Sequence, residues 1–188
     1  MTVTAESITG YKAGTWNIDP THSSVSFSVR HLMISKVKGT FDSFSATFVT
    51  GENPLDTKVT ATAQVASINT NQADRDGHLR TGDFFEAEKF PTINFVSTSV
   101  AAKDAAAGEF VVTGDLTIKG VTKSVDFNFE LGGFATDPYG QYKVAATAVT
   151  EINREDFGLT YNAALETGGV LIGEKVTITI ELQAVLAQ

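Results

Sequence analysis

Apolar and polar residues alternate along much of this 188-residue chain, and this pattern restricts the possible folds more than any other feature. Val25, Phe27 and Val29 share one parity, and serines stand between them. A period of two places successive side chains on opposite faces of a β-strand, so this stretch predicts a strand with one apolar and one solvated face. The same alternation recurs over residues 59–65, 110–118, 121–131 and 176–186. The sequence therefore predicts a protein built mainly of half-buried strands.

Two interruptions of the alternation predict changes of chain direction. Within residues 37–49 the apolar parity shifts partway, which indicates a bulge or bend near Asp42 and Ser43. Across Lys119-Gly120 the parity inverts, which is typical of a tight hairpin turn. The first feature is typical of a barrel corner, and the second predicts a hairpin.

Residues 71–89 do not follow the alternation. The segment is dense in charge, and Asn71 and Asp83 are candidate helix N-caps. We predict a long loop here, with one or two short helices inserted between the strands.

About nine strand-like segments with short connections must close into a barrel or stack as two sheets, because exposed strand edges promote aggregation. Segments of roughly ten residues would enclose a lumen about 30 Å tall, which favours a barrel over a sandwich of short strands. The sequence shows no internal repeat or linker, so we predict one all-β antiparallel domain over residues 1–188. Residues 1–13 are expected to form a loosely ordered N-terminal extension.

The composition excludes several classes of protein. With 14 basic and 22 acidic side chains the formal charge is −8, so nucleic-acid binding is not expected. The absence of cysteine excludes disulfides and thiolate metal sites. No apolar run approaches the length of a membrane span. The first residues lack the basic and apolar regions of a signal peptide, so we expect a cytoplasmic protein; a periplasmic or secreted one would require that a signal had been removed.

The sequence contains few features that indicate catalysis. None of the strong hydrolase, phosphate-binding or dinucleotide-binding motifs occurs. A metal-dependent or acid/base enzyme using His31, His78 and Asp76 is one alternative, although their spacing matches no familiar zinc motif. The simpler interpretation of residues 74–80 is a solvated helix whose charged side chains pair with their neighbours.

The presumed inner face mixes very large and very small residues. Phenylalanine occurs 13 times, whereas Gly39, Ala61, Ala63 and Gly114 lie on comparable apolar parities. An eight-stranded barrel is just wide enough either to fill itself with side chains or to hold one small ligand. The periodicity alone leaves both possibilities open, including a packed barrel that serves only as a protein-interaction module.

A series of motifs in fixed order resembles one known family. They include WNIDPTHS at 16–23, GDLTIKGVT at 114–122 and REDFG at 154–158, with further matching segments at 27–35, 37–41, 67–70, 75–80, 83–85 and 90–95. Together they cover nearly the whole chain. The sequence resembles the YceI-like family of bacterial polyisoprenoid-binding proteins.

This resemblance implies an extended, lipocalin-like antiparallel barrel of eight strands, often dimeric, without catalytic activity and without a metal or covalent cofactor. Its apolar lumen would take up a long isoprenoid chain, an isoprenoid quinone or a similar amphiphilic lipid, for carriage, storage or sequestration. Many members are exported, and the missing signal peptide departs from that pattern.

The inner parities and the resemblance together give two sets of candidate site residues. The set expected to line the lumen comprises Phe27, Val29, Phe41, Ala61, Ala63, Phe84, Phe85, Phe95, Phe110, Leu116, Phe127, Phe129, Phe157, Ile178 and Ile180. The set expected to meet the lipid head group at the mouth comprises Arg30, His31, Arg75, His78 and Arg80, with Asp76 and Asp156 as orienting partners. A polar head group must stay in water or find hydrogen-bond partners, which is why these residues are expected at the mouth.

Overall fold

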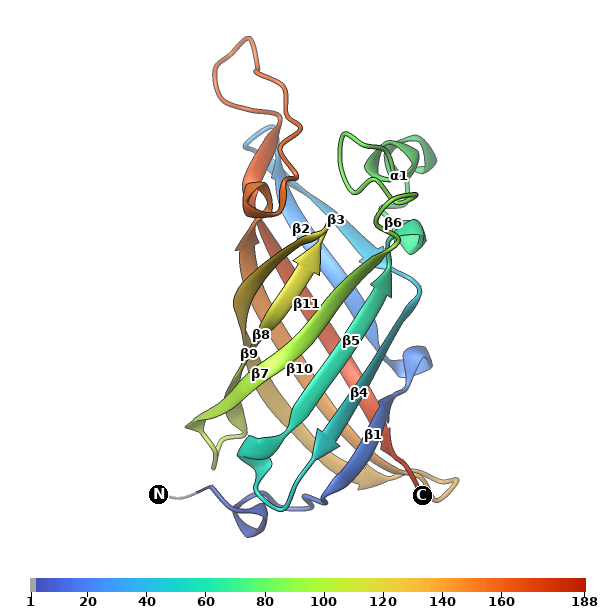
Figure 1. Ribbon diagram of the computed structural model, residues 1–188, viewed down its shortest axis with the longest axis vertical. Helices are drawn as coiled ribbons and strands as arrows, with labels where there is room; N and C mark the ends of the chain where they lie inside the picture. The colour runs from blue at the N-terminus through green and yellow to red at the C-terminus, as the bar shows by residue number, and fades with distance from the viewer. Residues whose placement is uncertain (1–2) are drawn as a thin grey trace.

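The computed structural model describes residues 3–188, which form one barrel with its long axis vertical in Figure 1. The strands are β1 (Gly14–Ile18), β2 (Ser24–His31), β3 (Ser35–Phe41), β4 (Phe44–Thr50), β5 (Lys58–Gln64), β6 (Ile68–Asn69), β7 (Thr92–Asp104), β8 (Glu109–Ile118), β9 (Val121–Thr136), β10 (Tyr142–Asn153) and β11 (Ile172–Leu186). The helical elements are α1 (Ala73–Leu79) and the short 3-10 turns η1 (Ala5–Ser7), η2 (Pro20–His22), η3 (Pro54–Asp56), η4 (Val65–Ser67) and η5 (Arg154–Phe157). No helix in the described part of the chain is long and apolar enough to cross a bilayer.

The strands close into an eight-stranded antiparallel barrel, as the sequence predicted. The order is β1-β4-β5-β7-β8-β9-β10-β11, and β11 pairs with β1 to complete the ring. Three of these eight positions are each occupied by two shorter strands that follow one another toward the other end: β1 and β2, β4 and β3, and β5 and β6. Strand β11 spans both halves: its residues 184–186 pair with β1 and its residues 172–181 pair with β2.

Local sequence explains the corners of the barrel. Strand β3 ends at Phe41 and β4 begins at Phe44, so the parity change near Asp42 is a bend between two strands. The backbone N–H of Asp42 donates to the Ser67 carbonyl at this bend. Lys119 and Gly120 both have positive φ, 50° and 74°, which is the backbone geometry of the tight hairpin turn predicted from the sequence.

The N-terminal segment packs across one end of the barrel. We expected residues 1–13 to be loosely ordered; of these, residues 1 and 2 lie outside the described residues, and the rest is docked. Ile8 is buried, the Tyr11 hydroxyl donates to the Gly51 carbonyl over 2.8 Å, and the Tyr142 hydroxyl donates to the Gly10 carbonyl. The burial of Ile8 and these two hydrogen bonds hold the segment against the strands, which the prediction of a loosely ordered extension did not include. The segment covers this end of the barrel, which we call the closed end.

A small charge cluster joins the strands near the closed end. Asp19 Oδ2 lies 2.8 Å from His22 Nδ1 and 3.2 Å from Lys143 Nζ. Hydrogen bonding to His22, reinforced by Lys143 against the opposing effect of burial, lowers the pKa of Asp19 to about 2. This carboxylate therefore stabilises the fold in its ionised form.

The opposite end of the barrel carries α1 and the long connection between η5 and β11 (Figure 1). The helix is capped by Gln72, whose side chain accepts a hydrogen bond from the backbone N–H of Arg75. The expected cap, Asn71, instead adopts a left-handed conformation with φ of 60°. The other expected cap, Asp83, begins no helix; its carboxylate contacts His78. One short helix, followed by turns, forms where we predicted one or two.

Candidate ligand-binding cavity

The barrel encloses a cavity of about 390 Å³. Its walls are formed by residues of β1 to β5 and β7 to β11, and its rim is formed by α1, the turns after it and the segment 159–172. From Ile172 to Leu182, two lining residues of β11, the strand covers roughly 33 Å, which corresponds to about 25 Å along the axis of a tilted barrel. The cavity is therefore a long tube rather than a surface cleft.

Glycine keeps the tube open by letting phenylalanine rings lie against its wall. Phe27 pairs across the strands with Gly39, and a Cβ on that glycine would stand 2.4 Å from the Phe27 ring. A Cβ on Gly114 would likewise stand 2.4 Å from the Phe95 ring. Real atoms do not approach so closely, so any larger residue at either position would displace the ring. The combination of large and very small residues on the inner face therefore leaves an open cavity with aromatic walls.

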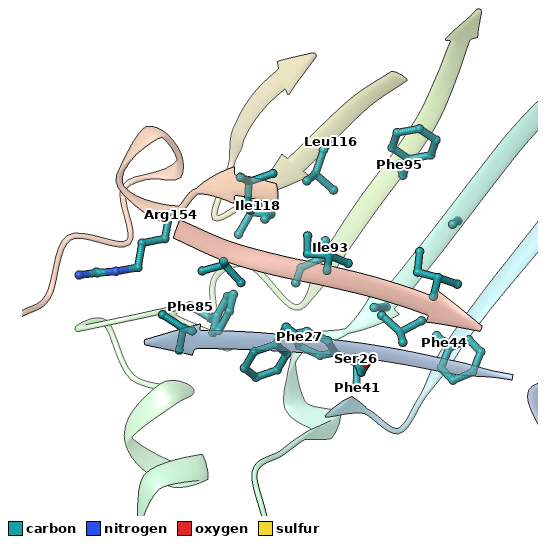
Figure 2. Close-up of a pocket in the computed structure, with 18 of the residues that line it drawn as sticks. Ser26, Phe27, Phe41, Phe44, Phe85, Ile93, Phe95, Leu116, Ile118 and Arg154 are labelled. Atoms are coloured by element: carbon teal, nitrogen blue, oxygen red, sulfur yellow. The ribbon is translucent and has the colours of Figure 1, made fainter. Parts of the chain in front are cut away.

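Aromatic side chains form much of the lining (Figure 2). The Phe41 ring centroid lies 5.7 Å from that of Phe27 and 6.0 Å from that of Phe85. Further along the tube the Phe95 and Phe127 centroids are 5.2 Å apart and nearly perpendicular. Tilted and edge-to-face pairs of this kind stabilise the rings against one another and give the tube a continuous aromatic wall.

Thirteen of the fifteen residues expected in the lumen line this cavity: Phe27, Val29, Phe41, Ala61, Ala63, Phe84, Phe85, Phe95, Leu116, Phe127, Phe129, Ile178 and Ile180. The other two lie elsewhere. Phe110 lines a second, smaller cavity, because β8 extends into the closed half of the barrel. Phe157 is 2% exposed and packs in the core from η5, where the chain has left the strand and its alternation no longer applies.

The smaller cavity, of about 100 Å³, lies toward the closed end. The N-terminal segment and the aromatic residues near it form its floor, including Ile8, Tyr11 and Trp16. Five side chains line both cavities and separate them: Phe48, Val59, Val112, Phe129 and Leu182. A layer of side chains, without backbone, therefore divides the tube.

The arginine and histidine side chains of the lining gather at the open end, whereas Ser26, Ser45, Thr62 and Asn94 lie along the strands. Of the expected head-group residues, Arg30, His31, Arg75 and His78 line the cavity. Arg75 donates through Nε to the Thr70 hydroxyl over 2.7 Å and through its terminal nitrogen to the Thr70 carbonyl over 2.9 Å. His78 Nε2 lies 2.8 Å from an Asp83 carboxylate oxygen.

Three expected head-group residues lie outside the cavity lining, two of them held by local hydrogen bonds and the third exposed to solvent. Asp76 is buried and accepts hydrogen bonds from the backbone N–H and hydroxyl of Thr70. Arg80 donates to the carbonyls of Ala66 and Ile68, which fastens α1 to the strand below it. Asp156 is exposed on η5.

Arg154 lines the cavity and was not among the expected site residues. It is 3% exposed and donates to the carbonyls of Leu159, Tyr161, Ile172 and Gly173. Burial lowers the pKa of its guanidinium group, and within residues 3–188 it forms no ion pair. Its position could have been found from parity, because it continues the buried even-numbered series of β10 that includes Ala148 and Ile152.

The residues of the alternative enzyme hypothesis have separate partners. Asp76 is directed at Thr70 and His78 at Asp83, while His31 lines the rim. Among residues 3–188 no group of three or more histidine or acidic side chains is arranged to hold a metal ion. Of the three, His31 and His78 line the cavity, where their ring nitrogens can form hydrogen bonds with a bound molecule.

Comparison with known proteins agrees with this geometry. The family model of the YceI-like domain matches residues 16–184. The UPF0312 protein of Staphylococcus aureus strain MSSA476 is 44% identical over 163 residues, which cover 86% of this chain and 91% of the relative. The chain belongs to the YceI-like family. The strain USA300 relative shares the same identity and coverage.

Solved structures of YceI-like proteins have the same barrel. The YCEI protein of Campylobacter jejuni superposes with a TM-score of 0.72 at 31% identity, covering 85% of this chain and 90% of that one. BcnA of Burkholderia cenocepacia gives a TM-score of 0.76 at 23% identity, covering 88% and 98%. A polyisoprenoid binding domain from Saccharophagus degradans gives 0.70 at 18% identity, covering 94% and 100%. The lipocalin-like fold predicted for the chain is confirmed.

Proposed function

We propose that this YceI-like protein binds a long-chain isoprenoid, such as a prenyl lipid or an isoprenoid quinone, in its lumen. The observation that carries the proposal is the tube itself, which has a mainly apolar lining, is covered at one end by the N-terminal segment and carries arginine and histidine side chains at its open rim. Each methylene transferred from water to such a wall contributes about 0.8 kcal/mol. The family membership, and the description of the Saccharophagus degradans domain as polyisoprenoid binding, support the same ligand class.

The rim is suited to the polar end of such a molecule. Arg30, His31, Arg75 and His78 line the cavity where it opens, and each carries nitrogen donors that can reach an acceptor such as a quinone carbonyl or a phosphate oxygen. The hydrocarbon chain would extend down the tube past Phe95 and Phe127. A ligand bound in this way would be carried, stored or sequestered, and we propose no catalytic role.

The preformed cavity also favours binding by reducing its entropic cost. The aromatic pairs and the glycine contacts fix the wall, so little of the protein must be ordered when a chain enters. A flexible isoprenoid still loses conformational freedom, which means that affinity depends on how many of its carbon atoms contact the wall. We therefore expect affinity to rise with chain length until the tube is filled.

A titration of delipidated protein tests the proposal. Protein extracted with organic solvent and refolded would be titrated with a series of isoprenoid quinones of increasing chain length, with binding followed by calorimetry. We expect saturable 1:1 binding that strengthens along the series. At a quinone concentration 100 times Kd the free energy of unfolding would rise by about 2.7 kcal/mol. Absence of saturable binding for every quinone and prenyl alcohol tried would refute the proposal.

A further inference from the structure

Exposed apolar side chains are concentrated at the rim of the cavity. Within residues 3–188, five of the eight exposed large hydrophobic residues lie in the β2–β3 turn and in the connection before β11: Leu32, Met33, Ile34, Tyr161 and Val170. Ile34 is 83% exposed. A clustered apolar patch on an otherwise acidic protein marks a binding surface rather than ordinary scatter.

The two loops form one continuous surface. The backbone N–H of Leu32 donates to the Leu171 carbonyl over 2.9 Å, and the Leu171 N–H donates to the Ala163 carbonyl over 2.9 Å. Ala164 and Val170 form a β-bridge inside the second loop. Figure 1 shows this loop rising above the end of the barrel beside the turn between β2 and β3. We call the residues 32–34, 161–165 and 170 the apolar rim.

The turn that presents this rim is made at a conformational cost. Leu32 and Met33 both have positive φ, 53° and 60°, a region that asparagine and glycine adopt far more easily. The chain thus places two large apolar side chains at the tip of a hairpin where small polar residues would be less strained. Strain of this kind, retained at an exposed position, indicates a functional surface.

The charges around the apolar rim favour a lipid bilayer over other occupants. Between residues 161 and 173 the single charged residue is Glu166, and the exposed Glu174 and Lys175 follow at the start of β11. Arg30 and Lys36 are exposed and pair across the hairpin, and in the described chain neither forms an ion pair. At a membrane surface, the apolar side chains of Met33 and Ile34 would contact hydrocarbon, and the basic side chains of Arg30 and Lys36 would contact lipid phosphates. Tyrosine, here Tyr161, is typical of the region between the two.

The same rim borders the opening of the tube. Three residues next to the apolar rim or within it also line the cavity: Arg30, Tyr161 and Leu171. The Leu171 carbonyl accepts the hydrogen bond from Leu32, and Arg30 precedes the exposed turn by two residues. We propose that the apolar rim docks on a lipid bilayer and inserts Met33 and Ile34 among the head groups, so that the lumen opens directly onto the membrane. This inference rests on the proposed function, because a long isoprenoid resides in membranes and would otherwise have to cross water.

Vesicle flotation tests the docking proposal. Wild-type protein, Ile34→Asp, Met33→Asp and Tyr139→Asp would be mixed with phosphatidylcholine vesicles, with or without phosphatidylglycerol. Tyr139 is a matched control, since it is 91% exposed but lies in the β9–β10 turn at the closed end (Figure 1). We expect each rim variant to lower the vesicle partition coefficient at least tenfold, and the control to leave it unchanged. The rate of quinone transfer out of vesicles should fall in parallel.

The outcomes separate this proposal from the proposed function. Neither Ile34 nor Met33 lines the cavity, so equilibrium binding of a quinone by delipidated protein should be unchanged in both variants. A wild-type protein that binds quinone but floats with neither vesicle composition would overturn docking and leave the proposed function intact. Rim-dependent flotation without any quinone binding would support docking while the proposed function fails. A dimer that Ile34→Asp dissociates, with no flotation, would make the rim a protein interface and overturn the proposal.

Discussion

Replacing Ala63 with phenylalanine tests whether the space in the barrel is available to a ligand. Ala63 lies on β5 between its cross-strand partners Phe44 and Ile93, and its side chain lines the cavity. It is 9% exposed and packs against Phe41 and Ile68. A phenyl ring at this position must project into the tube, because the walls on both sides are already occupied.

The two possible interiors predict different energies for Ala63→Phe. In a filled core the extra ring would destabilise the protein by about 1–3 kcal/mol or more. In an open tube the ring occupies empty space, and burial of its apolar surface offsets the strain, so we expect the delipidated protein to change by less than about 1 kcal/mol. The ring also excludes the volume of roughly four methylenes, worth about 3 kcal/mol or a hundredfold in ligand affinity.

Two measurements on Ala63→Phe decide the matter. Urea denaturation of the delipidated protein gives the free energy of unfolding, and quinone titration gives the affinity. Thr60→Phe is a matched control, because Thr60 lies on the same strand but is exposed on the outer face. Strong destabilisation of the delipidated protein, or unchanged affinity for a long quinone, would show that Ala63 does not face space that a ligand occupies.

Three further changes test other parts of the account. Gly114→Ala places a Cβ 2.4 Å from the Phe95 ring and 2.6 Å from a backbone oxygen, so it should cost about 1–3 kcal/mol in urea denaturation and weaken quinone binding. With the pKa of Asp19 lowered to about 2, its contribution is complete above about pH 4 and is lost as the pH falls toward 2. Asp19→Asn should therefore lower Tm at neutral pH, and the difference from wild type should vanish near pH 2. Phe129→Ala removes part of the layer between the cavities, at a cost of up to about 3–5 kcal/mol, and should let a longer quinone reach the floor and change Trp16 fluorescence.

The strands and most of the lumen could be predicted because one physical rule controls both. In a closed barrel every second residue of a strand points inward, and in this chain most of the inward residues are apolar, so the parity of Phe27, Ala61 and Ile178 predicted the face on which each lies. The Lys119-Gly120 turn followed from the same parity, because the two strands it joins are in register.

Elements outside the alternation were harder to predict. The N-cap of α1 depended on whether Asn71 or Gln72 took the cap conformation, and the left-handed backbone at Asn71 decided it. The positions of Phe157 and Asp156 depended on a 3-10 turn that ends the parity of β10. The docking of the N-terminal segment depends on contacts between residues more than 100 positions apart, such as that of Gly10 with Tyr142, which no local pattern reveals.

The position of Arg154 shows the limit of judging residues by type. Its parity places it inside the barrel with Ile152, but a charged residue is not expected in an apolar wall unless its donors are satisfied. Four carbonyls of the segment 159–173 satisfy them, and they are brought to Arg154 by the tertiary fold. The same hydrogen bonds hold the connection that carries residues 161–165 and 170 of the apolar rim.

Native mass spectrometry of freshly purified protein tests whether the tube holds a lipid. We expect a complex heavier than the 20.0 kDa chain by one molecule of several hundred daltons, from which organic extraction releases an isoprenoid or similar long-chain lipid. Ala63→Phe protein prepared in the same way should carry less of this molecule or a shorter one. Wild-type protein that is free of any lipid when isolated, and that takes none up from prenyl lipids or quinones added afterwards, would contradict the claim that the tube is a binding site.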